Sequence, residues 1–139
     1  MKLLFFLLTT ILVSPVVAQK LSAEKVPAEV KESFKKQFPD VTDVKWELEK
    51  KSVYEASFKM DGKTMSANFS DKGEWQETET DLKVAELPKA ATDYIAQHYK
   101  GAKIKEAALI KKPGGVTRYE AEVNGKDLIF DEKGNFVGE

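Results

Sequence analysis

Apolar residues recur at every fourth position in two short segments of the chain. The first stripe comprises Val26, Val30, Phe34 and Phe38, and the second comprises Leu87, Ala91, Ile95 and Tyr99. This spacing predicts two helices that each bury one face. Pro27 and Pro88 stand at the predicted helix starts, where the missing N–H of proline removes no hydrogen bond. Pro39 and Gly101 are expected to end the two helices.

After each helix the pattern changes to a period of two, which is typical of strands that bury one face. Four strands are predicted in the first half, over residues 44–49, 54–60, 65–69 and 75–80. Four more are predicted over residues 104–111, 116–123, 126–130 and 135–137. Gly62 and Gly125 fall in the turns, where tight hairpins require positive φ. Each half is therefore predicted to be a helix followed by an antiparallel meander.

The two halves also share short motifs. Tyr54-Glu55-Ala56 recurs as Tyr119-Glu120-Ala121, and Asp71-Lys72-Gly73 recurs as Asp131-Glu132-Lys133-Gly134. We predict an α+β fold of two tandem helix-plus-four-stranded antiparallel meander repeats, with the helices packed on one face of the sheet or sheets. Repeat 1 spans residues 26–80, a linker spans residues 81–86 and repeat 2 spans residues 87–139. Whether the repeats share one continuous sheet is left open.

The first 18 residues have the features of a secretory signal peptide. Lys2 precedes an apolar run from Leu3 to Val13, and Val16 and Ala18 are small residues at the expected cleavage site. The run is shorter than the roughly 20 residues that span a bilayer, so no membrane span is expected after cleavage. Residues 19–25 are predicted to be a flexible lead-in. Because the chain has no cysteine, we expect an exported bacterial protein, periplasmic or secreted, that is not a lipoprotein.

Composition argues against several classes of function. The chain has 22 basic and 23 acidic residues, whereas nucleic-acid binding favours a basic excess. His98 is the only histidine, so a histidine or cysteine metal site is not expected. The Asp71 and Asp131 turns lack the alternating oxygen ligands of a calcium loop. We therefore predict no catalytic residue, no metal site and no cofactor, and we do not expect an enzyme.

Strand parity places one set of side chains on the sheet face opposite the helices. This open face is predicted to be strongly charged, and our candidate partner-binding residues on it are Glu55, Lys59, Arg118, Glu120 and Glu122. A separate acidic run follows, comprising Glu74, Glu77, Glu79, Asp81 and Glu86. It is either a docking strip or a charged sheet edge that discourages aggregation, and we favour the edge.

The repeated motifs carry a family resemblance. Val26-Pro27 with Tyr54-Glu55-Ala56, and Leu87-Pro88 with Tyr119-Glu120-Ala121, resemble the signature of the PepSY-like, β-lactamase-inhibitor-like family. The resemblance covers nearly all of the chain after residue 18. It implies a secreted or periplasmic protein with a helix-plus-sheet fold. It also implies similarity to inhibitors whose open sheet face grips an enzyme, or to modulators of other envelope proteins.

The function that these observations favour is a noncatalytic, exported protein-binding module that uses its open sheet face, with an envelope protein of unknown identity as partner. One alternative is an inhibitor of a peptidase or β-lactamase, for which the turn at Lys111–Gly115 is the candidate inserting loop. Another is the binding of a small ligand between the sheet and the helices. The sequence does not identify the partner or the oligomeric state.

Overall fold

Both helices form where the four-residue stripes predict them. The structure is a computed structural model that describes residues 18–139, so the predicted signal peptide, apart from Ala18, lies outside the described residues. Helix α1 spans Ala28–Gln37 and helix α2 spans Lys89–His98. Pro27 and Pro88 are the N-caps, as expected for residues that start a helix without donating a hydrogen bond.

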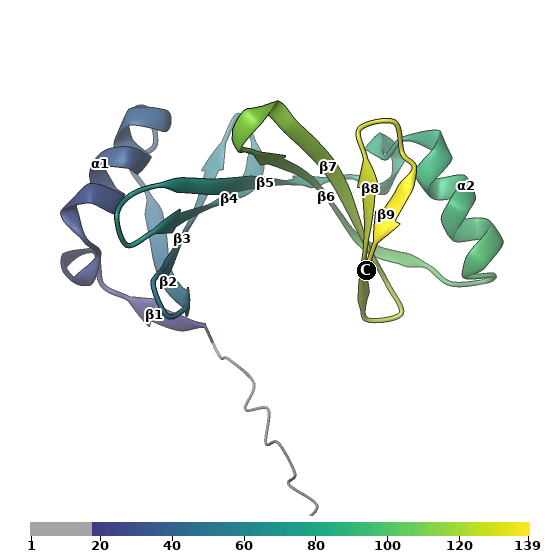
Figure 1. Cartoon of the computed structure of the whole chain (residues 1–139), viewed down its shortest axis with the longest axis horizontal. Coiled ribbons are helices and arrows are strands. Elements are labelled where there is room, and N and C mark those ends of the chain that lie inside the picture. Colours follow the sequence, from purple (N-terminus) through teal and green to yellow (C-terminus); the bar gives the residue numbers. More distant parts are fainter. Residues whose placement is uncertain (1–17) are drawn as a thin grey trace, which may run out of the picture.

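Nine antiparallel strands form one sheet in which each strand lies next to its neighbours in the sequence (Figure 1). The strands are β1 (Gln19–Leu21), β2 (Val44–Lys50), β3 (Val53–Met60), β4 (Lys63–Ser70), β5 (Trp75–Leu82), β6 (Ile104–Lys112), β7 (Val116–Val123), β8 (Lys126–Asp131) and β9 (Phe136–Gly138). Three short 3₁₀ helices, η1 (Ala23–Lys25), η2 (Val84–Glu86) and η3 (Pro113–Gly115), lie in the connections.

The predicted division into two tandem helix-plus-four-stranded meander repeats is wrong, although the fold is broadly α+β. Strand β5 pairs with β6 over a register that runs from Thr78 opposite Lys111 to Leu82 opposite Ala107. Separate meanders would leave these two strands as long edges with unpaired N–H and C=O groups. Pairing them satisfies those groups and joins two halves that would each bury little surface alone.

Two segments outside the predicted repeats also belong to the sheet. The lead-in over residues 19–25, expected to be flexible, holds β1 and η1, and Leu21 of β1 lies opposite Trp46 of β2. The linker expected over residues 81–86 begins inside β5, which ends at Leu82, and continues as η2. Both segments therefore add backbone pairing that the repeat boundaries had left out.

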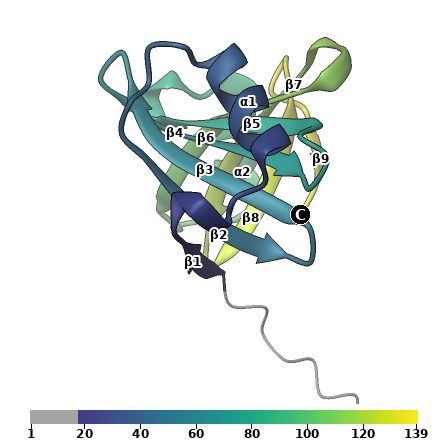
Figure 2. The same cartoon turned by 90° about the vertical axis from the view of Figure 1, so that its left-hand side faces the viewer.

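The sheet bends into an arch, and both helices lie on its convex side, one at each end (Figures 1 and 2). Two separate cores result. Around α1 the buried apolar residues are Val26, Val30, Phe34, Phe38, Trp46, Ala56, Phe58, Ala67 and Phe69. Around α2 they are Leu87, Ala91, Ile95, Ala107, Ala121, Val123, Leu128 and Phe130. Neither core reaches the opposite side of the sheet, which no helix covers.

A glycine turn fixes each helix to the sheet. Gly73 in the β4–β5 turn has φ +77° and Gly134 in the β8–β9 turn has φ +86°. A Cβ at Gly73 would lie 2.5 Å from the carbonyl oxygen of Glu29, in the first turn of α1. A Cβ at Gly134 would lie 2.7 Å from the Cβ of Pro88, at the start of α2. The repeated Asp-to-Gly motif is therefore the point at which each half of the sheet contacts its helix.

Candidate binding face

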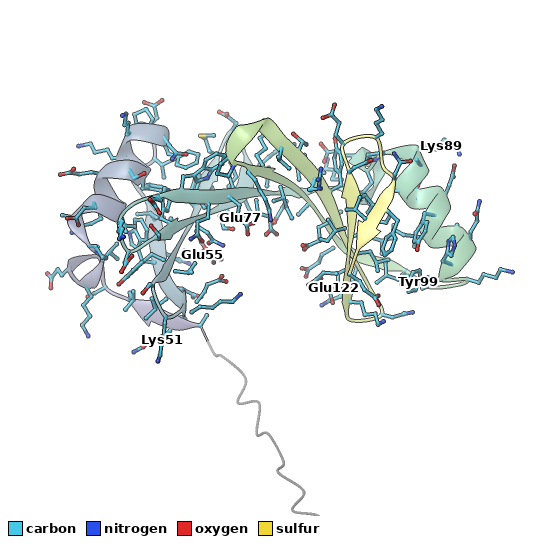
Figure 3. The ribbon with its side chains drawn as sticks, viewed as in Figure 1. Lys51, Glu55, Glu77, Lys89, Tyr99 and Glu122 are labelled. Atoms are coloured by element: carbon cyan, nitrogen blue, oxygen red, sulfur yellow. The ribbon has the colours of Figure 1, made fainter. Side chains whose placement is uncertain are left out.

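The concave side of the arch, opposite both helices, is the candidate functional site, and we call it the concave face. Residues directly opposite on neighbouring strands point to the same side of a sheet. Glu55 of β3 lies opposite Glu47 and Asn68, and Asn68 lies opposite Glu77 of β5. Figure 3 shows Glu55, Glu77 and Glu122 pointing into the arch from different strands. The strand registers thus define a continuous polar face that spans both halves.

Acidic groups outnumber basic groups on this face. Its acidic residues are Glu47, Glu49, Glu55, Glu77, Glu79, Asp81, Glu106, Glu120, Glu122, Asp127 and Asp131. The basic residues that belong to it or reach it are Lys20, Lys45, Lys50, Lys59, Lys105, Lys112 and Arg118. None of its residues is aromatic, because the aromatic side chains of the strands pack into the two cores on the convex side.

The five candidate residues lie on two limbs of the arch. Glu55 and Lys59 belong to β3, on the limb that carries α1. Arg118, Glu120 and Glu122 alternate along β7, on the limb that carries α2. The fold therefore does not bring all five together at one point. It places them on the same concave face, to either side of β5 and β6.

Strand β5 contributes residues whose place the sequence pattern did not reveal. The acidic run was expected to protect a sheet edge, but β5 is the fifth of nine strands and pairs with β4 and β6. That edge interpretation is wrong for Glu77, Glu79 and Asp81, which lie on the concave side of the middle strand of the sheet. Their alternation with Thr78, Thr80 and Leu82 was the available signal, since period two assigns the two sets to opposite sides.

Burial and mutual repulsion disturb the titration of the central carboxyl groups. Desolvation, and then the nearby charges of Glu120 and Glu77, raise the pKa of Glu79 to about 7. Desolvation and a hydrogen bond with Glu49 raise the pKa of Glu55 to about 7. The pKa of Glu120 is also raised, first by desolvation and then by the charge of Asp127. Because these carboxyl groups share one face, the negative charge of each one disfavours ionisation of its neighbours.

The apolar floor beneath these groups explains their desolvation. Ala108 and Ile110 of β6 are only 5% and 6% exposed, although they lie on the side that no helix covers. Ile110 lies opposite Glu79 and Arg118, and Ala108 lies opposite Asp81 and Glu120. The longer polar side chains therefore cover the small β6 residues and lose contact with water themselves, which disfavours their charged forms.

The basic residues form ion pairs with carboxylates at the rim of this face and not with those at its centre. Lys112 lies 3.3 Å from Glu77 and Lys105 lies 3.0 Å from Glu122. Arg118 donates to the carbonyl oxygen of Thr117 and lies opposite Asp131 of β8. Over residues 18–139, no basic group forms an ion pair with Glu79 or Glu120. The centre of the face thus carries uncompensated negative charge.

Hydrogen-bond acceptors are also in excess on the concave face. Asn68 donates its amide to Glu77 at 3.4 Å, while its own side-chain oxygen is buried and receives no hydrogen bond from the described protein groups. By contrast, α1 on the convex side exposes three lysines, Lys31, Lys35 and Lys36. Helix α1 also exposes Glu29 and Glu32, so its own balance is three basic to two acidic residues, whereas acidic groups are in excess on the concave face.

The described part of the chain shows no arrangement for metal binding. Within residues 18–139, no three histidine, aspartate or glutamate side chains are grouped to hold a metal ion. His98 is exposed on α2, donates its Nδ1–H to the carbonyl oxygen of Tyr94 over 2.9 Å, and stacks on the Tyr94 ring at 4.0 Å. No helix among the same residues is long and apolar enough to cross a membrane.

Two open hollows lie at the α1 end of the sheet. One, of about 390 Å³, lies along β1 and β2 and is lined in part by Leu21, Val44 and Trp46. The other, of about 320 Å³, lies between the loop after α1 and the ends of β3 and β4, and Lys59 is one of its lining residues. Both are shallow surface features, and neither is an enclosed cavity between the sheet and the helices.

Comparison with known proteins identifies a family and solved structures of similar architecture. It matches the family described as "Putative beta-lactamase-inhibitor-like, PepSY-like" over residues 16–61 and 52–138. A BLIP-like protein from Bacteroides fragilis is 27% identical with a TM-score of 0.69, and the alignment covers 81% of this chain and 84% of that one. No curated protein shows significant similarity to the chain.

Two further solved structures share the fold. A DUF2874 family protein from Bacteroides uniformis is 24% identical with a TM-score of 0.71, over 80% of this chain and 86% of that one. A protein from Bacteroides eggerthii described as "putative periplasmic" is 23% identical with a TM-score of 0.70, over 81% and 86% of the two chains. The single arched sheet is thus a recurrent structure.

Proposed function

The chain belongs to the PepSY-like, β-lactamase-inhibitor-like family, and from this premise we propose that it is a noncatalytic binding module that engages a protein of the bacterial envelope through its concave face. The observation that carries the proposal is the position of the helices. Both pack on the convex side, so the whole opposite side of the sheet remains available to a partner. Such an uncovered, curved surface can contact a partner from several strands at once.

An exported location fits this role. The features of residues 1–18 are those of a signal peptide, and a solved structure of the same fold is described as periplasmic. We therefore propose that the protein works in the periplasm or outside the cell. The proposed partner is an envelope protein for the same reason.

Capture from an envelope extract tests this proposal. The test variant replaces Glu55, Lys59, Arg118 and Glu120 by alanine, and the control variant replaces Glu24, Lys36, Lys72 and Glu132, which are exposed residues of the same charge balance away from the concave face. We expect the wild type and the control variant to retain a partner that the test variant loses. Equal capture by all three proteins, with unchanged melting temperatures, would exclude the concave face as the binding surface.

Inhibition of a peptidase or β-lactamase is the alternative named by the family description. Tight interfaces usually depend on a few buried aromatic or arginine anchors. The concave face has no aromatic residue, and the η3 turn at Pro113–Gly115 carries none either. A panel of periplasmic hydrolases assayed with and without the protein distinguishes the two functions, because a binding module leaves every rate unchanged.

A further inference from the structure

We infer that the concave face binds a positively charged partner segment that is rich in lysine or arginine. The carboxylates of Glu79 and Glu120, at the centre of the concave face, provide the main attraction. This inference rests on the proposed function and adds the chemistry of the partner. It also moves the centre of the site from the predicted limbs of the arch to β5 and the neighbouring part of β7. Three independent features of the structure support this inference.

The first feature is the position of the acidic residues on the sheet. Glu79 lies on β5, in the middle of the nine strands, and Glu120 lies beyond β6, where small Ala108 separates it from Asp81. The ion pairs of the face involve its rim, through Lys112 and Lys105, and leave this centre without a cation. A cationic partner would supply the charge that the fold itself does not place there.

The second feature is the hydrogen-bonding chemistry of the concave face. Carboxylates accept hydrogen bonds and donate none when ionised, and the buried oxygen of Asn68 on the same face is an acceptor without a donor. Lysine and arginine side chains have only donors, so they match this surface. An acidic partner would add repulsion, and a neutral partner could donate hydrogen bonds but would bring no positive charge to the carboxylates.

The third feature is the position of exposed lysines on the convex side of the molecule. Lys31, Lys35 and Lys36 on α1 are exposed, and they lie on the convex side, away from the central carboxylates. The chain thus has enough lysines to neutralise its acidic groups, but it does not place them at the centre of the concave face. Electrostatic attraction would therefore orient an approaching basic segment toward one side of the arch.

Direct binding of a defined probe tests the inference. The probe is a fluorescein-labelled peptide in which lysine alternates with alanine, and its matched control has glutamate in place of lysine. Fluorescence anisotropy near pH 8 and low salt compares the wild type with the double variant Glu79→Gln and Glu120→Gln. A second double variant, Glu24→Gln and Glu132→Gln, removes the same charge from exposed positions outside the face.

We expect the lysine peptide to bind and the glutamate peptide not to bind. The variant of Glu79 and Glu120 should weaken binding about tenfold, as expected for two lost charge contacts of somewhat under 1 kcal/mol each, while the control variant changes it little. Binding should weaken at high salt, and also at about pH 5.5, which lies below the raised pKa of Glu79, about 7. Glutamine is isosteric with glutamate, so equal or higher melting temperatures will show that the variants are folded.

Three results would overturn the inference. They are failure of the lysine peptide to bind at low salt, equal weakening by both double variants, and a concentration-dependent dimer that the Glu79 and Glu120 variant abolishes. The last would identify the lysines of a second copy as the occupant. If an envelope protein is captured through the concave face while the lysine peptide does not bind, the proposed function stands and the basic character of its partner is refuted.

Discussion

Replacing Gly73 by alanine tests two requirements of this position, a positive φ in the β4–β5 turn and a close contact with α1. Gly73 has φ +77°, and its missing Cβ leaves room for the carbonyl oxygen of Glu29 in α1. Gly62 in the β3–β4 turn provides the matched control, because it has φ +75° and no atom within 4 Å of the position of a Cβ. Both changes impose the same backbone conformation on alanine, and only one of them adds a steric overlap.

The expected magnitudes differ accordingly. A left-handed conformation costs alanine about 1–2 kcal/mol, and the smaller conformational entropy of the unfolded chain offsets about 0.4–1 kcal/mol of this. Gly62→Ala should therefore reduce the free energy of unfolding by about 1 kcal/mol or less. Gly73→Ala also forces backbone atoms of Glu29 apart from a methyl group, which adds about 1–3 kcal/mol by comparison with overpacked cores. Its total should be about 2–4 kcal/mol.

Urea unfolding followed by circular dichroism measures both values on the same protein. The difference between the two variants isolates the contact between the turn and the helix, since the backbone term is common to them. If Gly73→Ala and Gly62→Ala destabilise the protein equally, the close approach of the β4–β5 turn to α1 makes no energetic contribution. The role of the repeated glycine motif as a helix contact would then be refuted.

Two predictions concern pH. The raised pKa of Glu79, about 7, means that the folded state holds a proton which the unfolded state releases near 4.5, so stability falls as pH rises between these values. Glu79→Gln should therefore raise stability near pH 8 by roughly 1–2 kcal/mol, after allowing for the water that still reaches this group, and have little effect near pH 4. A gain in melting temperature that is the same at both pH values would contradict this. Hydrogen bonds from Asn135 lower the pKa of Asp131, so this carboxylate stabilises the β8–β9 turn above its unfolded pKa and loses the effect as pH falls through its folded pKa. Asp131→Ala should lower the melting temperature at neutral pH and approach the wild type in acid, which a pH series of thermal melts will measure.

Local pattern was sufficient for both helices, for eight of the nine strands and for the sides on which their side chains lie. The stripe from Val26 to Phe38 predicted α1, and alternation around Tyr54 and Tyr119 predicted which strand residues face the helices. These signals depend on neighbours within a few positions, where periodicity is informative. The same parity also located Glu55 and Glu120 on the side of the sheet opposite the cores.

Pairing between distant segments was the part that local pattern did not determine. Strand β5 has the same alternation whether it lies at an edge or in the middle of a sheet, so the acidic run was assigned to an edge. Its partner β6 begins 22 residues after the end of β5, beyond η2 and α2. Strand β1 was missed for a related reason, since Gln19-Lys20-Leu21 is too short to show alternation. It is a strand because Leu21 can join the core beside Trp46.

Folding alone does not account for the charge pattern of the concave face. A protein is stabilised by a net of only about 5–15 kcal/mol, so ionising a partly buried carboxyl group beside others is a considerable penalty. Neighbours such as Ser57 and Ser66 could hold lysines on the same surface, and nothing in the cores on the other side would change. The chain instead keeps Glu79 and Glu120 without an ion-pair partner among residues 18–139 and exposes Lys31, Lys35 and Lys36 on α1. Local departures of this kind from the best folded arrangement are concentrated at functional sites, where a partner supplies the missing interaction. The uncompensated centre of the concave face is therefore the feature of this protein that binding explains and stability does not.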